Sequence, residues 1–93
     1  GASIHPDLPF TRAEIAWAVQ DEMCMTLEDA LSRRTRSLLL DARAAMEAAP
    51  AVATIMANEL GKDETWKINQ VNEFTGLAKN YLPTTNYKPQ TIN

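Results

Sequence analysis

The sequence predicts an all-α fold, a small compact bundle of four to five short helices. Apolar residues recur along it at three- and four-residue spacing, which is the period of an amphipathic helix. Residues that cap helix N-termini stand directly before several of these stretches. The 93 residues include only three glycines, so the Gly-rich turns that join β-strands are missing.

Composition narrows the classes of function. One cysteine excludes a disulfide framework, and together with a single histidine it excludes a Cys/His zinc site. A net charge of −3 argues against a nucleic-acid partner, which normally requires a basic face. No apolar run approaches the ~20 residues that span a bilayer, and no signal peptide is visible. We therefore predict one soluble domain with a cytoplasmic location.

The chain is predicted to have three parts. Residues 1–10 contain two prolines and no periodic pattern, which predicts an irregular lead-in where His5 is an ordinary surface residue. Gly1 is interpreted as a residue left by protease cleavage, so we expect the chain to be a piece of a longer protein. Residues 11–82 form the predicted helical domain. Residues 83–93 are predicted to be a polar tail without a packed structure.

The first helix is predicted to begin after Thr11. The sequence T-R-A-E is a capping box, in which the Thr11 hydroxyl accepts from the Glu14 amide and the Glu14 carboxylate accepts from the Thr11 amide. Phe10, just before the cap, is expected to pack against Ile15 one turn into the helix. This local pattern fixes where the helix starts.

The same helix is predicted to turn one apolar stripe toward the core. Ile15, Val19 and Met23 follow one another at four-residue spacing. Trp17 lies well off this stripe, so we expect a second surface to cover it.

Two further helix starts are predicted in the middle of the chain. Thr26 opens a second capping box, T-L-E-D, for a short helix. Asp41 is a suitable N-cap for the Ala-rich segment 42–49, although the helix could instead run through from Ser37. The apolar residues of the short helix are Leu27, Ala30 and Leu31.

The last two helices are marked by proline, glycine and aspartate. Pro50 suits the first turn of a new helix, and Gly61 stands where a helix C-terminal glycine belongs. Asp63, or the residue before it, starts the final helix, which Leu82-Pro83 ends. The apolar residues expected on these helices are Val52, Ile55, Met56 and Leu60, then Trp66, Val71, Phe74, Leu77, Ala78 and Tyr81.

Three arginines lie among four carboxylates in the segment 22–41. An arginine pairs bidentately with either a carboxylate or a phosphate. One interpretation is that these charges bridge the domain's own helices; the other is that an arginine reaches a phosphate or an acidic patch on a neighbouring domain. The carboxylates are Glu22, Glu28, Asp29 and Asp41. The candidate interdomain or phosphate-facing residues are Arg33, Arg34, Arg36, Glu22, Asp29 and Trp17.

A series of motifs runs in order from about Leu8 to Leu82. They are L-P-F-T-R-A-E-I, A-V-x-x-E-M, T-L-E-D-A-L-S-R-R-T-R, L-D-A-R-A-A and A-P-x-V-A-x-I-M-A-x-E-L-G. The series closely resembles the C-terminal domain of the FAD-dependent glycerol-3-phosphate dehydrogenases and alpha-glycerophosphate oxidases, and T-L-E-D-x-L-x-R-R-T-R is its most specific part. The run Met23-Cys24-Met25 departs from the small or basic residues usual there. The matching residues are Glu14, Glu22, Thr26, Glu28, Asp29, Leu31, Arg33, Arg34, Thr35, Arg36, Asp41, Ala49, Pro50 and Val52.

The resemblance implies a flavoenzyme parent. Such enzymes oxidise sn-glycerol 3-phosphate to dihydroxyacetone phosphate and pass the electrons through FAD to a quinone or to oxygen. Their flavin and substrate sites belong to a large N-terminal part, which would be this domain's partner in the same polypeptide. The chain has no Gly-rich strand–helix turn for a pyrophosphate, so we expect no FAD, catalytic or metal-binding residues in it. We expect no enzymatic activity from it alone, and a parent that is peripheral on the cytoplasmic membrane.

The sequence also allows other interpretations of the domain's role. The amphipathic helices would also suit a free-standing adaptor that binds a partner protein and has no enzymatic parent. In the intact enzyme, the arginines could instead bind the substrate phosphate. The apolar surface around Trp17 could drive dimerisation of the excised domain. Cys24 is expected to be a small buried hydrophobe, and Met23, Met25, Met46 and Met56 are expected to fill the core.

Overall fold

The computed structural model describes residues 4–34 and 41–81, and within these ranges it leaves out the side chains of Glu22, Arg33 and Arg34. The predicted tail therefore lies outside the described residues. Three α-helices, α1 (Arg12–Glu22), α3 (Ala42–Leu60) and α4 (Glu64–Ala78), are joined by a π-helical segment, η1 (Asp29–Arg34), and followed by a 3₁₀ turn, η2 (Lys79–Tyr81). No β-strand occurs in either described range, and the prediction of an all-α bundle is confirmed.

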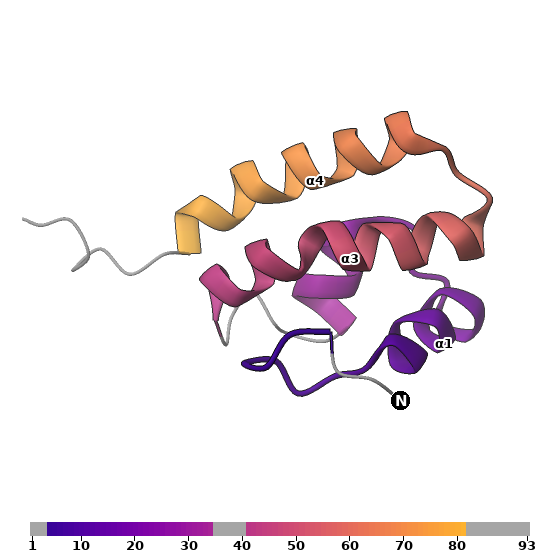
Figure 1. Ribbon diagram of the computed structural model, residues 1–93, viewed down its shortest axis with the longest axis horizontal. Helices are drawn as coiled ribbons and strands as arrows, with labels where there is room; N and C mark the ends of the chain where they lie inside the picture. The colour runs from indigo at the N-terminus through magenta and orange to yellow at the C-terminus, as the bar shows by residue number, and fades with distance from the viewer. Residues whose placement is uncertain (1–3, 35–40, 82–93) are drawn as a thin grey trace, which may run out of the picture.

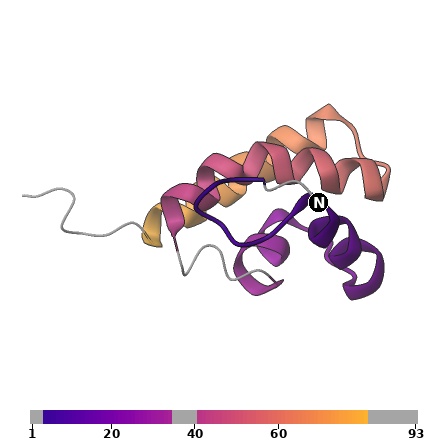
Figure 2. The ribbon, with the colours of Figure 1, turned by 60° about the horizontal axis from the view of Figure 1, so that its bottom comes forward.

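The helices are arranged around α3. Helix α4 lies along one side of α3, while α1 and the lead-in lie on the opposite side (Figures 1 and 2). The turn that leads into η1 is hydrogen-bonded to α4. Helix α3 therefore packs against both neighbours and forms the centre of the domain. Small side chains occupy its buried positions, which lets the neighbouring backbones approach closely. Those residues are Ala42, Ala44, Ala45, Ala48, Ala49, Val52, Ala53, Met56 and Ala57.

Helix α1 begins as predicted. The Thr11 hydroxyl accepts from Glu14 N at 3.3 Å, and Glu14 Oε1 accepts from Thr11 N at 2.8 Å. The helix ends at Met23, which adopts the left-handed conformation with φ 58° and donates its N–H to the Ala18 carbonyl. The Cys24 N–H donates to the same carbonyl at 3.3 Å, so two bonds close the helix end.

The predicted second capping box holds the segment before η1. The Thr26 hydroxyl accepts from Asp29 N at 3.1 Å, and Asp29 Oδ2 accepts from Met25 N at 3.3 Å. The carboxylate thus reaches one residue further back than the cap. The three apolar residues predicted for this helix, Leu27, Ala30 and Leu31, are all fully buried.

Helix α3 starts where Asp41 predicts. Asp41 is extended, with φ −160° and ψ 94°, and its carboxylate accepts from Ala44 N at 3.0 Å. The alternative prediction, a helix that runs through from Ser37, is wrong, because the extended Asp41 would interrupt it. Ser37 itself lies outside the described ranges.

The prediction of a new helix at Pro50 is also wrong. Pro50 lies inside the nineteen-residue helix α3. Proline removes one helical hydrogen bond, here the bond to the Met46 carbonyl, at a cost of about 3 kcal/mol. The helix continues because Pro50 is on its exposed face, while the buried positions run unbroken from Ala48 and Ala49 to Val52 and Ala53.

The turn between α3 and α4 follows the prediction. Gly61 has φ 71° and ψ 36°, and the Lys62 N–H donates to the Ala57 carbonyl at 2.9 Å. This is a Schellman-type end, for which glycine is favoured. Asp63 then caps α4 by accepting from Trp66 N at 2.9 Å. On α4 and η2, Phe74 and Ala78 are buried, whereas Tyr81 is exposed.

The lead-in is part of the packed structure. Leu8 and Phe10 are buried in the same core as Ile15, which agrees with the predicted packing of Phe10 on Ile15. The prediction that His5 is an ordinary surface residue is wrong. Its side chain is 12% exposed, and its Nε2 lies 2.7 Å from Glu47 Oε1 on α3.

The methionines divide into two groups. Met56 is fully buried and Met46 packs against the core, as predicted. The prediction is wrong for Met23 and Met25, which are 75% and 53% exposed. Met23 leaves the apolar stripe because the helix ends there in the left-handed conformation. Cys24 is buried between the two, as expected.

Candidate interdomain surface

The candidate residues come from three adjoining segments. Trp17 lies in the middle of α1, and Glu22 is the last residue of that helix. Asp29 begins η1, whose last two residues are Arg33 and Arg34. Arg36 lies outside the described residues. The three arginines and Glu22 therefore have no described side-chain partner, and whether they form ion pairs or face a phosphate stays a prediction.

Asp29 has a defined structural role. Its carboxylate accepts from Met25 N, and its own amide donates to the Thr26 hydroxyl. These bonds tie the loop after α1 to the start of η1. The Leu27 N–H donates to Gln70 Oε1 at 2.8 Å, which fixes the same loop to helix α4. Asp29 thus holds the geometry of the segment that precedes the arginines.

Three exposed apolar side chains lie within or directly after the C-terminal half of α1. Among the described residues, five large apolar side chains are exposed, and three of them lie within nine consecutive residues. Trp17 is 49% exposed, and the second surface that is expected to cover it stays a prediction. We call Trp17, Met23 and Met25 the α1 surface. The sequence pointed to Trp17 alone, because the left-handed turn that exposes the methionines has no glycine to mark it.

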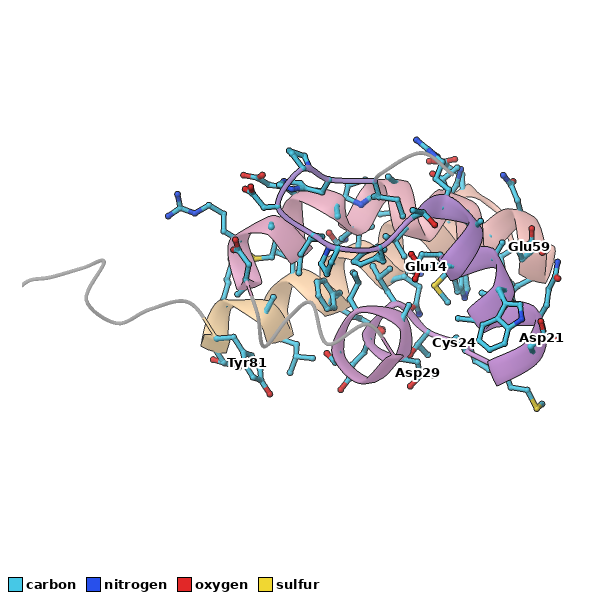
Figure 3. All side chains as sticks on the ribbon, turned by 90° about the horizontal axis from the view of Figure 1, so that it is seen from below. Glu14, Asp21, Cys24, Asp29, Glu59 and Tyr81 are labelled. Carbon is cyan, nitrogen blue, oxygen red and sulfur yellow. The ribbon has the colours of Figure 1, made fainter. Side chains whose placement is uncertain are left out.

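Acidic residues lie on the same side of the molecule. Figure 3 shows Glu14 and Asp21 on α1, Asp29 on η1 and Glu59 at the end of α3, all visible from the side on which α1 lies. Glu59 Oε1 accepts from Gln20 Nε2 at 2.5 Å, which joins α1 to α3.

Among the residues that the structure describes, two hollows lie along α4, and the sequence indicated neither of them. The larger, about 300 Å³, runs between α3 and α4. Lys67 Nζ lies 2.8 Å from Glu64 Oε1 at its edge. The smaller, about 140 Å³, lies between α4 and the Thr26 turn. The first is lined by Pro50, Thr54, Glu64, Lys67, Ile68, Val71 and Asn72, and the second by Thr26, Glu28, Gln70, Glu73, Phe74 and Leu77.

Residues 4–34 and 41–81 contain no group of three His, Cys, Asp or Glu side chains that could hold a metal ion. In the same ranges, no helix has the length and apolar character needed to cross a membrane. What this part of the chain does present is packed helices, the α1 surface and its acidic neighbours.

Comparison with known proteins identifies the family. A family model described as the C-terminal domain of alpha-glycerophosphate oxidase matches residues 1–67. The chain belongs to this family. The family prediction made from the T-L-E-D-x-L-x-R-R-T-R series is thereby confirmed. No solved structure matches the chain.

Relatives of this C-terminal domain are mitochondrial glycerol-3-phosphate dehydrogenases. The Schizosaccharomyces pombe enzyme is 43% identical over 58 residues, which cover 62% of this chain and 9% of the relative. The Macaca fascicularis enzyme is 34% identical over 82 residues (88% and 11%), and the Homo sapiens enzyme is 34% identical over 71 residues (76% and 10%). The chain thus spans about a tenth of the length of these relatives.

The two glycines that the structure describes, Gly61 and Gly76, do not form the turn of a flavin site. A dinucleotide site needs a Gly-rich turn between a strand and a helix. Gly61 closes the end of α3, and Gly76 lies inside α4, so both have structural positions far from such a turn.

Proposed function

We propose that this chain is the non-catalytic C-terminal domain of an FAD-dependent enzyme that oxidises sn-glycerol 3-phosphate to dihydroxyacetone phosphate. Electrons would leave through a quinone or through oxygen. The observation that supports this most directly is the family match over residues 1–67, together with relatives named glycerol-3-phosphate dehydrogenase. The FAD/substrate part of the same polypeptide would be the domain's partner.

The role of the domain in that enzyme would be structural. Its core is continuous from the lead-in to α4. A packed domain of this kind stabilises the part on which it docks, because separating the two would expose apolar surface to water. A free-standing adaptor is less well supported, since the whole match is to a domain of a larger enzyme.

The cellular location of the whole protein is also part of the proposal. The sequence predicts a cytoplasmic location with a parent on the membrane surface, while the names of the relatives place those enzymes in mitochondria. Peripheral attachment of the parent at a membrane would be consistent with electron transfer to a quinone.

The test uses the full-length polypeptide that contains this chain. We expect the purified protein to show a flavin absorbance spectrum that bleaches when sn-glycerol 3-phosphate is added without an acceptor. Dihydroxyacetone phosphate should form at the same time. The same protein with residues 4–93 deleted should have both a lower melting temperature and a lower activity. A full-length protein that neither contains flavin nor oxidises glycerol 3-phosphate would contradict the proposal.

A further inference from the structure

We propose that Met23 and Met25 form a reversible oxidation site, where hydrogen peroxide converts two exposed thioethers to sulfoxides while the fold is kept. This site goes beyond the proposed function and does not depend on it. It requires only that peroxide reaches the two side chains and that the backbone between α1 and η1 holds its shape without them.

The methionines of the domain differ in how easily peroxide reaches them. Met23 is 75% exposed and Met25 is 53% exposed, whereas Met56 is fully buried and Met46 is half-buried against the core. Cys24, between the two exposed methionines, is only 5% exposed. Oxidation of sulfur-containing side chains follows their exposure. We therefore expect the two exposed thioethers to react before the other sulfur atoms of the described residues.

The turn that carries both methionines is held by bonds of the main chain. The N–H groups of Met23 and Cys24 both donate to the Ala18 carbonyl, and the Met25 N–H donates to Asp29 Oδ2 at 3.3 Å. None of these bonds uses a thioether, so a sulfoxide at either position leaves them in place. A sulfoxide at Met56 would instead put a polar group into the packed core, which is unfavourable without a hydrogen-bond partner.

The reaction transfers one oxygen atom and two electrons. The thioether sulfur attacks one oxygen of hydrogen peroxide, the O–O bond breaks, and the other oxygen takes up a proton and leaves as water. Sulfur is oxidised and the peroxide is reduced. Methionine sulfoxide reductases reverse the change. In that step two thiols supply the electrons and form a disulfide, and the sulfoxide oxygen leaves as water.

The exposure of the two side chains serves both directions of this cycle. A sulfoxide at Met23 or Met25 is accessible to a reductase on the folded protein, because the thioether from which it forms is exposed. Each cycle consumes one molecule of peroxide and one pair of thiols. The turn would thus remove peroxide at the protein surface without loss of the domain.

Peroxide treatment of the full-length polypeptide that contains this chain tests the site. Mass spectrometry of peptides follows the gain of one oxygen atom at each methionine. We expect Met23 and Met25 to react at least ~10-fold faster than Met56, which should stay protected after both have reacted. Rates at Met23 and Met25 no higher than the rate at Met56 would overturn the proposal. So would a Met56 rate that rises, once both are oxidised, to the rate in urea, because the fold would then be lost.

Matched leucine variants identify the sulfur atoms that consume the peroxide. The double variant Met23→Leu/Met25→Leu removes both exposed thioethers, and Met46→Leu removes a half-buried one as the control. Leucine keeps the volume and apolar character of methionine. We expect the double variant to lose two equivalents of rapid peroxide consumption per chain and the control to lose none. Equal rapid consumption by the wild type and the double variant would contradict the proposal.

Reversibility has a separate test. The oxidised, folded protein is incubated with dithiothreitol and methionine sulfoxide reductases of both stereospecificities. We expect Met23 and Met25 to return to the unoxidised mass. Sulfoxides that persist in the folded protein, but are reduced in a proteolytic digest of it, would overturn the proposal of a reversible site. These measurements do not use glycerol 3-phosphate oxidation, so the oxidation site and the proposed function can fail independently.

Discussion

His5 Nε2 lies 2.7 Å from Glu47 Oε1, which joins the lead-in to the central helix α3. The other ring nitrogen, Nδ1, accepts from the Asp7 N–H at 3.1 Å. A neutral ring with its proton on Nε2 satisfies both contacts at once, since it donates to Glu47 and accepts from Asp7. The two bonds orient the imidazole and hold the turn at residues 5–8 against the helix.

Breaking this pair should weaken the domain only modestly. Because the Glu47 carboxylate is largely exposed, solvent screens the interaction. We therefore expect His5→Ala and Glu47→Gln each to lower the free energy of unfolding by about 0.2–1 kcal/mol. Chemical unfolding of both variants and the double variant measures the coupling. Additive effects would show that the two side chains do not interact.

Met23→Gly should stabilise the domain. Met23 is the one residue other than glycine with positive φ in the described ranges, and glycine adopts this conformation without strain. We expect a gain of about 1 kcal/mol in the free energy of unfolding, reduced by the greater freedom of glycine in the unfolded chain. Met25→Gly is the control, since its φ is not positive, and it should bring no gain. A loss of stability in Met23→Gly would contradict the argument.

Replacing Gly61 and Gly76 by alanine should change the stability of the domain in opposite directions. Nothing lies within 4 Å of a Cβ added at either Gly61 or Gly76, so neither substitution meets a steric clash. Gly61 has φ +71°, and alanine there should cost about 1–2 kcal/mol of backbone strain. Gly76 lies inside α4, where alanine should add about 0.5–1 kcal/mol. Thermal unfolding of the two variants should shift the midpoints apart; shifts of the same sign would be the contrary result.

Pro50→Ala should also stabilise the domain. An alanine would restore the N–H that donates to the Met46 carbonyl and would relieve the steric clash of the proline ring. We expect a gain of about 2 kcal/mol after allowing for the more flexible unfolded chain. Thr54 keeps its hydroxyl bond to the carbonyl of residue 50, at 3.1 Å in the present chain. Denaturant unfolding measures the gain, and an unchanged midpoint would mean that the helix has already adjusted around the proline.

If the full-length protein is the glycerol 3-phosphate-oxidising enzyme that we propose, Arg34→Ala and Arg36→Ala in it separate the two interpretations of the arginine cluster. If the arginines bridge the domain's own helices, the melting temperature should fall while KM for glycerol 3-phosphate stays unchanged. If one of them binds the substrate phosphate, KM should rise and the melting temperature should change little. Arg43→Ala, at an exposed position on α3, is the control for loss of a positive charge.

The parts of the fold that sequence predicted well are local. The caps at Thr11, Asp41 and Asp63 each depend on a side chain and an amide three residues later, so a short stretch of sequence contains the whole interaction. The prediction of a new helix at Pro50 was wrong because it used only the local tendency of proline to break a helix. The alanine positions that outweigh it act through packing against α1 and α4, which no short stretch reveals.

The sequence predicted only part of the α1 surface. Trp17 could be recognised because its helical position conflicts with the apolar stripe. Met23 and Met25 could not, since their exposure depends on a left-handed turn adopted by a methionine in place of glycine. The hollow between α3 and α4 depends on how two helices pair, and the sequence contains no motif for it.

The burial of Leu8 and Phe10 affects where this domain can be separated from the polypeptide before it. A cut placed at the Thr11 cap would keep every helix intact, yet it would remove two side chains that are each 4% exposed. The remaining helices would then surround an unfilled space, with water in contact with Ile15 and its neighbours. An excised domain that begins at its first helix is therefore expected to be a poor substitute for one that keeps the lead-in.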